Sequence, residues 1–184
     1  MNWRKCGAVV EARSRHTKAA LKLHTRWELR RGQVQGPVFS DGRTSERTSP
    51  LADEPVEAGS LYVADLGYFN LQMVAQRRQA GGYTLTRLQA GTALYSPQGQ
   101  RLCLANVLPP RVGQLKEMHV LVGAKQRMPM RRLLLRVPKA IADKRREDLL
   151  RDAQRRGQTI SEETLRLADW TILITDVRSQ ASLL

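Results

Sequence analysis

One carboxylate in this chain stands where chemistry often occurs, at the end of a short apolar run. Residues 59–64 read GSLYVA and lead into Asp65, and Gly67 follows before a helical pattern begins. In an α/β chain this predicts a strand that delivers Asp65 to the carboxyl edge of a sheet, where active sites tend to lie. Two interpretations stay open. Asp65 is a helix N-cap, which the spacing alone favours, or a ligand for Mg²⁺ or Mn²⁺, which prefer carboxylate oxygen.

Other residue types that do chemistry form no recognisable motif. Phosphate-binding glycine loops, GxSxG and HExxH are absent. The two cysteines are isolated and the three histidines are scattered, so neither a zinc site nor a disulfide framework is predicted, and a reduced intracellular compartment fits best. Several further carboxylates lie in expected loops or caps, and only the last of them ends a convincing strand: Asp41, Asp53, Glu54, Glu162, Glu163 and Asp176.

The charge of the chain indicates a polyanionic partner, of which nucleic acid is the usual one. The 184 residues hold 31 Lys and Arg against 17 Asp and Glu, a net charge of +14. Basic residues concentrate in residues 1–31 and 111–156, which flank a neutral segment around Asp65. This distribution predicts DNA-binding walls beside a carboxylate centre, and two solvated basic faces are the alternative. The candidate nucleic-acid-binding residues are Arg131, Arg132, Lys144, Arg145, Arg146, Arg155 and Arg156.

The first third of the chain predicts a basic arm followed by a hairpin. Residues 1–17 show no apolar periodicity and are expected to be irregular. Residues 19–29 alternate, with leucines and Trp27 on one face and Lys22, His24, Arg26 and Glu28 on the other. We expect His24 to be an exposed strand residue on the polar face, and residues 34–39 to form the partner strand.

The remaining elements follow from pattern and punctuation. Residues 60–88 predict a strand–helix–strand unit whose helix ends at Gly81 and Gly82. Residues 89–137 predict a small antiparallel β insertion. Pro138 opens a charged helix over residues 139–156 that Gly157 ends, Ser161 caps a short helix, and residues 170–177 form a buried strand. No stretch is long and apolar enough for a signal peptide or a membrane span, so a cytoplasmic protein is expected.

Several stretches, in the same order, resemble the catalytic domain of bacterial DDE transposases of the family typified by insertion sequence four. They are residues 20–29 (ALKLHTRWEL), 41–45 (DGRTS), 59–69 (GSLYVADLGYF), 82–88 (GYTLTRL) and 170–175 (WTILIT). The resemblance implies an α/β RNase H-like fold, in which a mixed sheet with flanking helices carries a small antiparallel β insertion, here at about residues 89–137. Residues 18–184 would form this domain.

The resemblance also implies an activity and a cofactor. Three carboxylates (Asp, Asp, Glu) would hold two divalent metals, Mg²⁺ or Mn²⁺, for DNA cleavage and strand transfer. Asp65 matches the second aspartate and is the candidate catalytic and metal-binding residue. DNA at transposon ends is the implied partner, with self-association or association with an intact transposase as further possibilities.

The chain departs from the family pattern at the other two carboxylates. No Asp precedes the stretch at residues 20–29, and the sequence after residues 170–175 contains no helix with the family's glutamate. Nothing matches Glu28, Asp41 or Asp176 to these positions. We therefore expect a transposase fragment truncated at both ends, lacking the first core strand and the last helix and inactive alone. The alternatives are a non-enzymatic DNA-binding or interaction protein derived from a transposase, and an unrelated nuclease.

Overall fold

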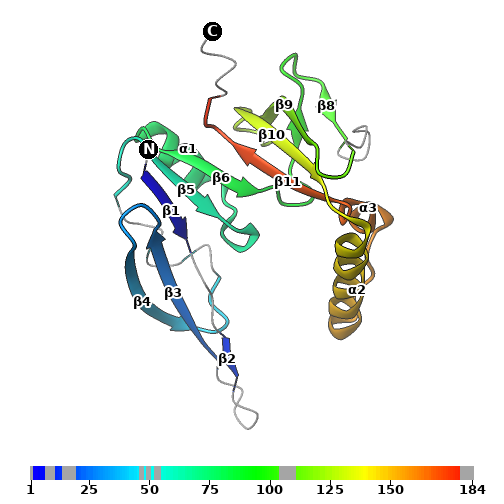
Figure 1. Cartoon of the computed structure of the whole chain (residues 1–184), viewed down its shortest axis with the longest axis horizontal. Coiled ribbons are helices and arrows are strands. Elements are labelled where there is room, and N and C mark those ends of the chain that lie inside the picture. The colour runs from blue at the N-terminus through cyan, green and yellow to red at the C-terminus, as the bar shows by residue number, and fades with distance from the viewer. Residues whose placement is uncertain are drawn as a thin grey trace. The chain divides into compact units, whose positions relative to one another are not determined.

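The computed structural model describes residues 2–6, 11–13, 20–45, 48, 51, 55–103 and 111–178 (Figure 1). The chain divides into two compact units. The first comprises residues 1–87 and 175–184, and the second comprises residues 88–174.

A mixed sheet forms the body of the first unit. Its strands lie in the order β4 (Gln33–Asp41), β3 (Ala20–Glu28), β1 (Asn2–Cys6), β5 (Ser60–Ala64) and β6 (Tyr83–Arg87) (Figure 1). The strands β1, β5 and β6 run parallel, whereas β3 is antiparallel to both β1 and β4. A short strand, β2 (Glu11–Arg13), pairs with the start of β3. This is the mixed α/β sheet predicted from the sequence.

The beginning of the chain corrects two predictions. Residues 2–6 and 11–13 form strands, so the irregular arm expected there is wrong, and the rest of residues 1–17 lies outside the described part. Because β1 lies between β3 and β5, the expected loss of the first core strand is wrong as well. The backbone hydrogen bonds of a neighbouring strand organise this basic segment, which carries no apolar pattern of its own.

The predicted strand–helix–strand unit is confirmed. After β5, a 3₁₀ turn η3 (Leu66–Tyr68) leads to the helix α1 (Leu71–Gln79) and then to β6. The Asn70 side chain accepts hydrogen bonds from the Gln72 and Met73 amides and caps α1. Gly81, at a φ of 79°, supplies the left-handed turn that ends the helix.

The predicted hairpin of β3 and β4 is confirmed, but the burial of its two faces is the reverse of what we expected. His24 is only 1% exposed, and Lys22, Arg26 and Glu28 are buried with it. On the opposite face Trp27 is 50% exposed, and it pairs across the hairpin with exposed Val34. The prediction that His24 is an exposed strand residue is therefore wrong.

Polar contacts explain why the charged face of β3 can be buried. The Lys22 ammonium donates to the Thr44 carbonyl at 2.8 Å, and the Arg26 guanidinium donates to the Leu51 carbonyl. The ring of Tyr62 on β5 also lies between two guanidiniums, 4.5 Å from Arg77 of α1 and 5.9 Å from Arg26. Buried cations need such partners, and here two neighbouring loops and Tyr62 of β5 provide them.

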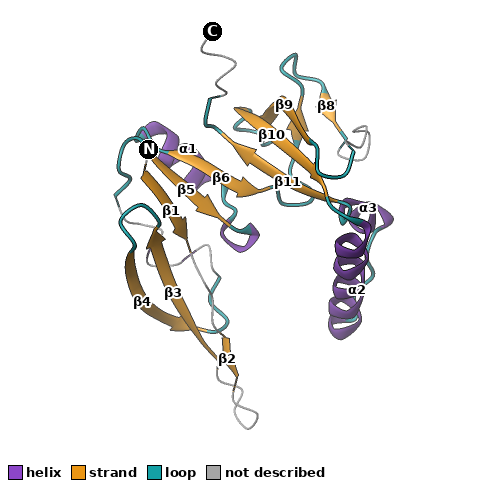
Figure 2. Ribbon diagram, viewed as in Figure 1, coloured by secondary structure: helices purple, strands orange, loops and turns teal. Residues whose placement is uncertain are grey.

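The second unit contains an antiparallel sheet and two helices (Figure 2). Its strands lie in the order β11 (Trp170–Thr175), β10 (Met128–Arg136), β9 (Leu115–Val122), β7 (Leu94–Tyr95) and β8 (Arg101–Leu102), with Thr175 already in the first unit. The antiparallel pairs β7–β8, β7–β9 and β9–β10 confirm the small antiparallel β insertion that was predicted.

The helices of the second unit begin and end where the sequence predicts. Helix α2 spans Lys139–Arg156, directly after Pro138, and Gly157 ends it at a φ of 61°. Helix α3 spans Glu162–Leu167, and the Ser161 hydroxyl accepts the Thr164 amide at its start. Within the described residues, no helix has the length and apolar character needed to cross a membrane.

Candidate functional site

Asp65 lies directly after β5, at the carboxyl edge of the sheet in the first unit. Its Oδ1 accepts a hydrogen bond from the Leu66 amide at 2.7 Å, so the residue caps the turn η3. The side chain is 70% exposed. The cap interpretation is thus observed, and a role as metal ligand stays a prediction.

Arg87 faces Asp65 from the neighbouring strand. Ala64 and Thr86 are register partners in the parallel pair β5–β6, so the next residues on each strand, Asp65 and Arg87, are adjacent. The Arg87 Nη1 lies 3.4 Å from the Asp65 Oδ1, and the Arg87 side chain is 47% exposed. An exposed pair of this kind contributes about 0–1 kcal/mol to stability. The sequence analysis did not propose Arg87 as a site residue. The one signal in the sequence was that the two expected strands of this unit are followed or ended by charged residues, Asp65 and Arg87, at the same edge of the sheet.

The other carboxylates that were considered do not join Asp65. Glu28 is buried opposite Arg4 in the middle of β1, whereas the edge near Asp65 lies beyond Cys6, the last residue of that strand. Asp41 lies on β4, where its Oδ1 accepts the Arg43 amide at 2.7 Å. Four strand spacings of about 4.8 Å separate β4 from β6.

Asp176 is also held away from the edge. Its Oδ1 accepts the Thr84 amide at 2.6 Å, and its Oδ2 is buried without a hydrogen-bond partner among the described residues. Thr84 pairs with Tyr62, three residues before Asp65, which is about 10 Å along a strand. Burial raises the pKa of Asp176, although the Thr84 amide and the nearby Arg78 and Arg77 act in the opposite direction.

The described residues do not fit the two-metal site that the resemblance implies. Nowhere in the part of the chain that the structure describes do three or more Asp, Glu, His or Cys side chains gather in a metal-binding cluster. Asp65 is one exposed carboxylate, and the charged group paired with it is the Arg87 guanidinium. A divalent cation placed there would meet a like charge from Arg87 instead of a second ligand.

A buried polar contact supports the turn that follows Asp65. The His24 Nε2 lies 2.7 Å from the Ser40 Oγ, and its Nδ1 lies 3.5 Å from the Tyr68 hydroxyl, at the long end for a hydrogen bond. Tyr68 in turn donates its amide hydrogen to the Asp65 carbonyl at 3.0 Å. The buried face of β3 therefore contributes to the position of the Asp65 turn, which the expected exposure of His24 did not suggest.

The two predicted DNA-binding residues on β10 are engaged or buried. Arg131 makes a bidentate ion pair with Glu117, with N···O distances of 2.5 and 2.8 Å. The hydrogen bond from Arg131 lowers the pKa of Glu117, and the same bond raises that of Arg131. Arg132 is 1% exposed, so burial removes it from the surface where the sequence analysis placed it.

The predicted residues on α2 divide into anchors and surface cations. Arg145 donates to the Trp170 carbonyl and to the Thr171 hydroxyl, and Arg146 pairs with Asp143 and Asp169. These contacts attach the first half of α2 to the strand and turn beside it. The remaining three are exposed, with Arg155 paired to Asp152 at 2.7 Å: Lys144, Arg155 and Arg156.

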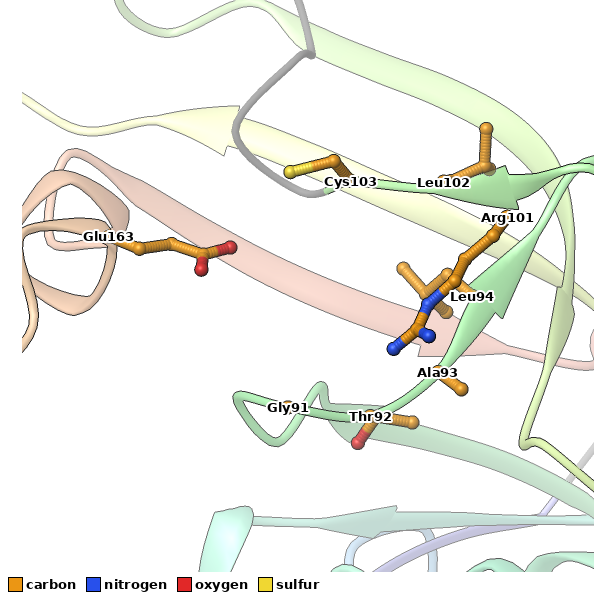
Figure 3. Close-up of a pocket in the computed structure, with 8 residues that line it drawn as sticks. All are labelled: Gly91, Thr92, Ala93, Leu94, Arg101, Leu102, Cys103 and Glu163. Carbon is orange, nitrogen blue, oxygen red and sulfur yellow. The ribbon is translucent and has the colours of Figure 1, made fainter.

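One pocket lies within the second unit and contains none of the predicted site residues. Its volume is about 400 Å³, and β7, β8 and the start of α3 line it (Figure 3). Figure 3 shows the Glu163 carboxylate and the Cys103 sulfur extending into the same space, with the Arg101 guanidinium on the side of Thr92. These groups form neither a metal-binding cluster nor an evident nucleophile–base pair.

The sequence of this chain is similar to those of known transposases. It is 24% identical over 179 residues to the transposase for insertion sequence element IS231B of Bacillus thuringiensis subsp. berliner. The transposase for IS231D of Bacillus thuringiensis subsp. finitimus is 25% identical over the same length. Each match covers 86% of this chain and 37% of the relative, so the chain spans little more than a third of these proteins. No family model and no solved structure matches. The chain is therefore similar to insertion-sequence transposases over most of its own length.

Proposed function

We propose that this chain is the portion of a DDE transposase that carries the second aspartate of the catalytic set and binds DNA at transposon ends. The similarity to insertion-sequence transposases over 86% of the chain supports this most directly. The mixed sheet supports it too, because the order β4, β3, β1, β5, β6 agrees with an RNase H-like core. In that arrangement Asp65 follows a parallel strand at the carboxyl edge, as a catalytic aspartate would.

This portion is not expected to cleave or join DNA by itself. The family's cofactor is Mg²⁺ or Mn²⁺, and the described residues provide one suitable carboxylate at the edge. None of the five residues of β1 is acidic, and Glu28, Asp41 and Asp176 lie elsewhere in the unit. The chain would act in the bacterial cytoplasm.

DNA binding is proposed to depend on exposed cations rather than on all the basic residues of the chain. Lys144 and Arg156 on α2 are exposed, and Arg87 is exposed at the sheet edge. By contrast, Arg145 and Arg146 attach α2 to its surroundings, so their loss would affect folding first. The net charge of +14 would support binding to any DNA sequence through the phosphates.

A second candidate is a non-enzymatic protein, derived from a transposase, that binds DNA or associates with an intact transposase. The ion pair of Asp65 with Arg87 favours it, since a guanidinium faces the one candidate metal ligand at the edge. The two candidates share DNA binding and differ in whether Asp65 belongs to a catalytic set of carboxylates.

A gel-shift salt series with element-end DNA tests the shared part. Binding should weaken steeply as salt rises, with each lost phosphate contact changing the slope of log K against log salt by about 0.9. Lys144→Ala combined with Arg156→Ala should lower both affinity and slope, whereas Glu147→Ala, on the same helix, should not lower affinity. No binding at low salt would refute the proposal.

Metal-dependent nicking tests the expectation, common to both candidates, that this chain does not cleave DNA by itself. The purified chain is incubated with supercoiled DNA carrying the element ends and Mg²⁺ or Mn²⁺. We expect no turnover above that of the Asp65→Ala variant. Robust nicking that Asp65→Ala abolishes would show a catalytically competent chain. Cleavage without preference for element ends would instead favour an unrelated nuclease.

A further inference from the structure

The Asp65–Arg87 pair has a geometry that the backbone fixes. The two residues follow register partners on neighbouring parallel strands, so their Cα atoms stay about 5 Å apart whatever rotamers the side chains adopt. The amide of Leu66 also holds the Asp65 carboxylate at Oδ1, the same oxygen that faces the guanidinium. The carboxylate and the cation are therefore built into the same edge.

The surroundings of this pair favour an anion over a metal ion as the third group. Among the described residues Asp65 belongs to no cluster of three or more potential metal ligands, and Arg87 is exposed enough to reach a ligand from solvent. A guanidinium recognises phosphate oxygens through several N–H donors in a fixed plane. Asp65 competes for the same donors and repels an approaching phosphate, so it weakens the site without closing it.

We propose that this edge is a metal-independent phosphate site, in which Arg87 contacts the DNA backbone and Asp65 restrains that contact by holding the guanidinium. The inference rests on the proposed DNA binding. It differs from the metal-ligand interpretation in the direction in which DNA affinity changes when Asp65 is neutralised. If Asp65 held a metal that DNA needs, neutralising it would weaken binding, whereas here neutralising it strengthens binding.

The size of the effect follows from the charges. A phosphate on Arg87 would lie about 6 Å from the Asp65 carboxylate, and two unit charges at that distance in water repel enough to change affinity about threefold. Asp65→Asn removes this repulsion and releases the guanidinium. Asparagine caps turns about as well as aspartate, and surface changes alter folding little, so the fold should persist.

Asp41→Asn is the matched control. It makes the same change in net charge on the same sheet, and asparagine can still accept the Arg43 amide. Four strand spacings, about 19 Å, separate β4 from β6. Because that exceeds the screening length of about 10 Å at 0.1 M salt, Asp41→Asn should leave DNA affinity almost unchanged.

The experiment measures the affinity of the full chain for a short duplex by fluorescence anisotropy, in EDTA and in Mg²⁺, over a salt series. We expect wild-type binding in EDTA that Mg²⁺ does not strengthen, about threefold tighter binding by Asp65→Asn, and weaker binding by Arg87→Gln with a salt slope reduced by about one phosphate contact. The double variant Asp65→Asn/Arg87→Gln should match Arg87→Gln alone, because without Arg87 no phosphate is held at this edge for Asp65 to repel.

Two kinds of failure can be told apart. DNA binding that EDTA abolishes, or an Asp65→Asn variant that binds no better than Asp41→Asn, overturns this inference and leaves the proposed DNA binding intact. Absence of binding by the wild type and all variants at low salt overturns both.

Discussion

Replacing Arg132 by methionine is expected to stabilise the second unit, although the change removes a charged side chain. Arg132 is 1% exposed and lies on β10 between the buried residues Met130 and Leu134. Its Nη2 donates to the Met118 sulfur at 2.8 Å, a weak acceptor. Its Nε and Nη1 are buried without hydrogen-bond partners among the described residues, and burial lowers the pKa of the guanidinium.

The expected gain follows from these unbonded donors. A buried donor without a partner costs about 1–3 kcal/mol, and replacing buried charged groups by well-packed apolar ones is often neutral or stabilising by about 1–4 kcal/mol. Methionine keeps the length of the arginine stem and adds no donor. We expect Arg132→Met to raise the free energy of unfolding by about 1–3 kcal/mol.

Arg131→Met is the matched control on the other face of the same strand. It breaks the partly exposed ion pair with Glu117 and should lower stability by about 1 kcal/mol, the upper end for pairs near the surface. Arg131 lowers the pKa of Glu117, so this contribution is present above the ordinary glutamate pKa and is lost as pH falls through the lowered one.

Urea unfolding, with hydrogen exchange of the β9 and β10 amides to report on this unit, measures both variants. A loss of more than about 1 kcal/mol in Arg132→Met, together with no change in Arg131→Met, would refute the reasoning. It would mean that the buried guanidinium has stabilising interactions that outweigh its unbonded donors.

Three further substitutions test the first unit. Asp176→Asn should raise the melting temperature at neutral pH, because the raised pKa of Asp176 means that its ionised form lowers stability. The gain should shrink as pH falls through that pKa, where the carboxyl becomes protonated. An equal gain at pH 3 and pH 7 would contradict this explanation. Gly82→Ala should lower stability by about 1–3 kcal/mol in urea unfolding, since a Cβ would lie 2.8 Å from the Val56 Cγ1. His24→Leu should cost about 1–3 kcal/mol by removing the ring nitrogens that contact the Ser40 and Tyr68 hydroxyls, and His24→Gln should cost less in the same assay; equal losses would argue for packing alone.

Local structure was predictable because local residues specify it. The boundaries of α2 follow from Pro138 and Gly157, and the position of Asp65 follows from the apolar run of β5 and the turn behind it. In each case the determining residues lie within a few positions of the element, so pattern and capping rules are sufficient.

The burial of β3 was not predictable from the same kind of rule. Alternation correctly separates Trp27 from His24, but it does not say which of the two faces the rest of the unit will cover. That depends on Tyr62 and on carbonyls from two loops, all more than twenty residues from their partners on β3. Apolar side chains such as Trp27 stay exposed because the rest of this unit covers the charged face of β3 and provides its hydrogen-bond partners.

The environment of Asp65 depends on the same kind of long-range pairing, and Asp65 alone is therefore weak evidence for a function. A carboxylate that accepts the Leu66 amide would be expected at this position in many proteins without any catalytic role, because Asp is among the best caps. Its partner Arg87 is 22 positions away, and the sheet brings it to 3.4 Å only through the register of β5 with β6. The capping bond accounts for Asp65 alone, whereas the pair requires both strands in register. The pair, and not Asp65 alone, therefore indicates a function, and the decisive measurement is whether Asp65→Asn raises or lowers the affinity for DNA.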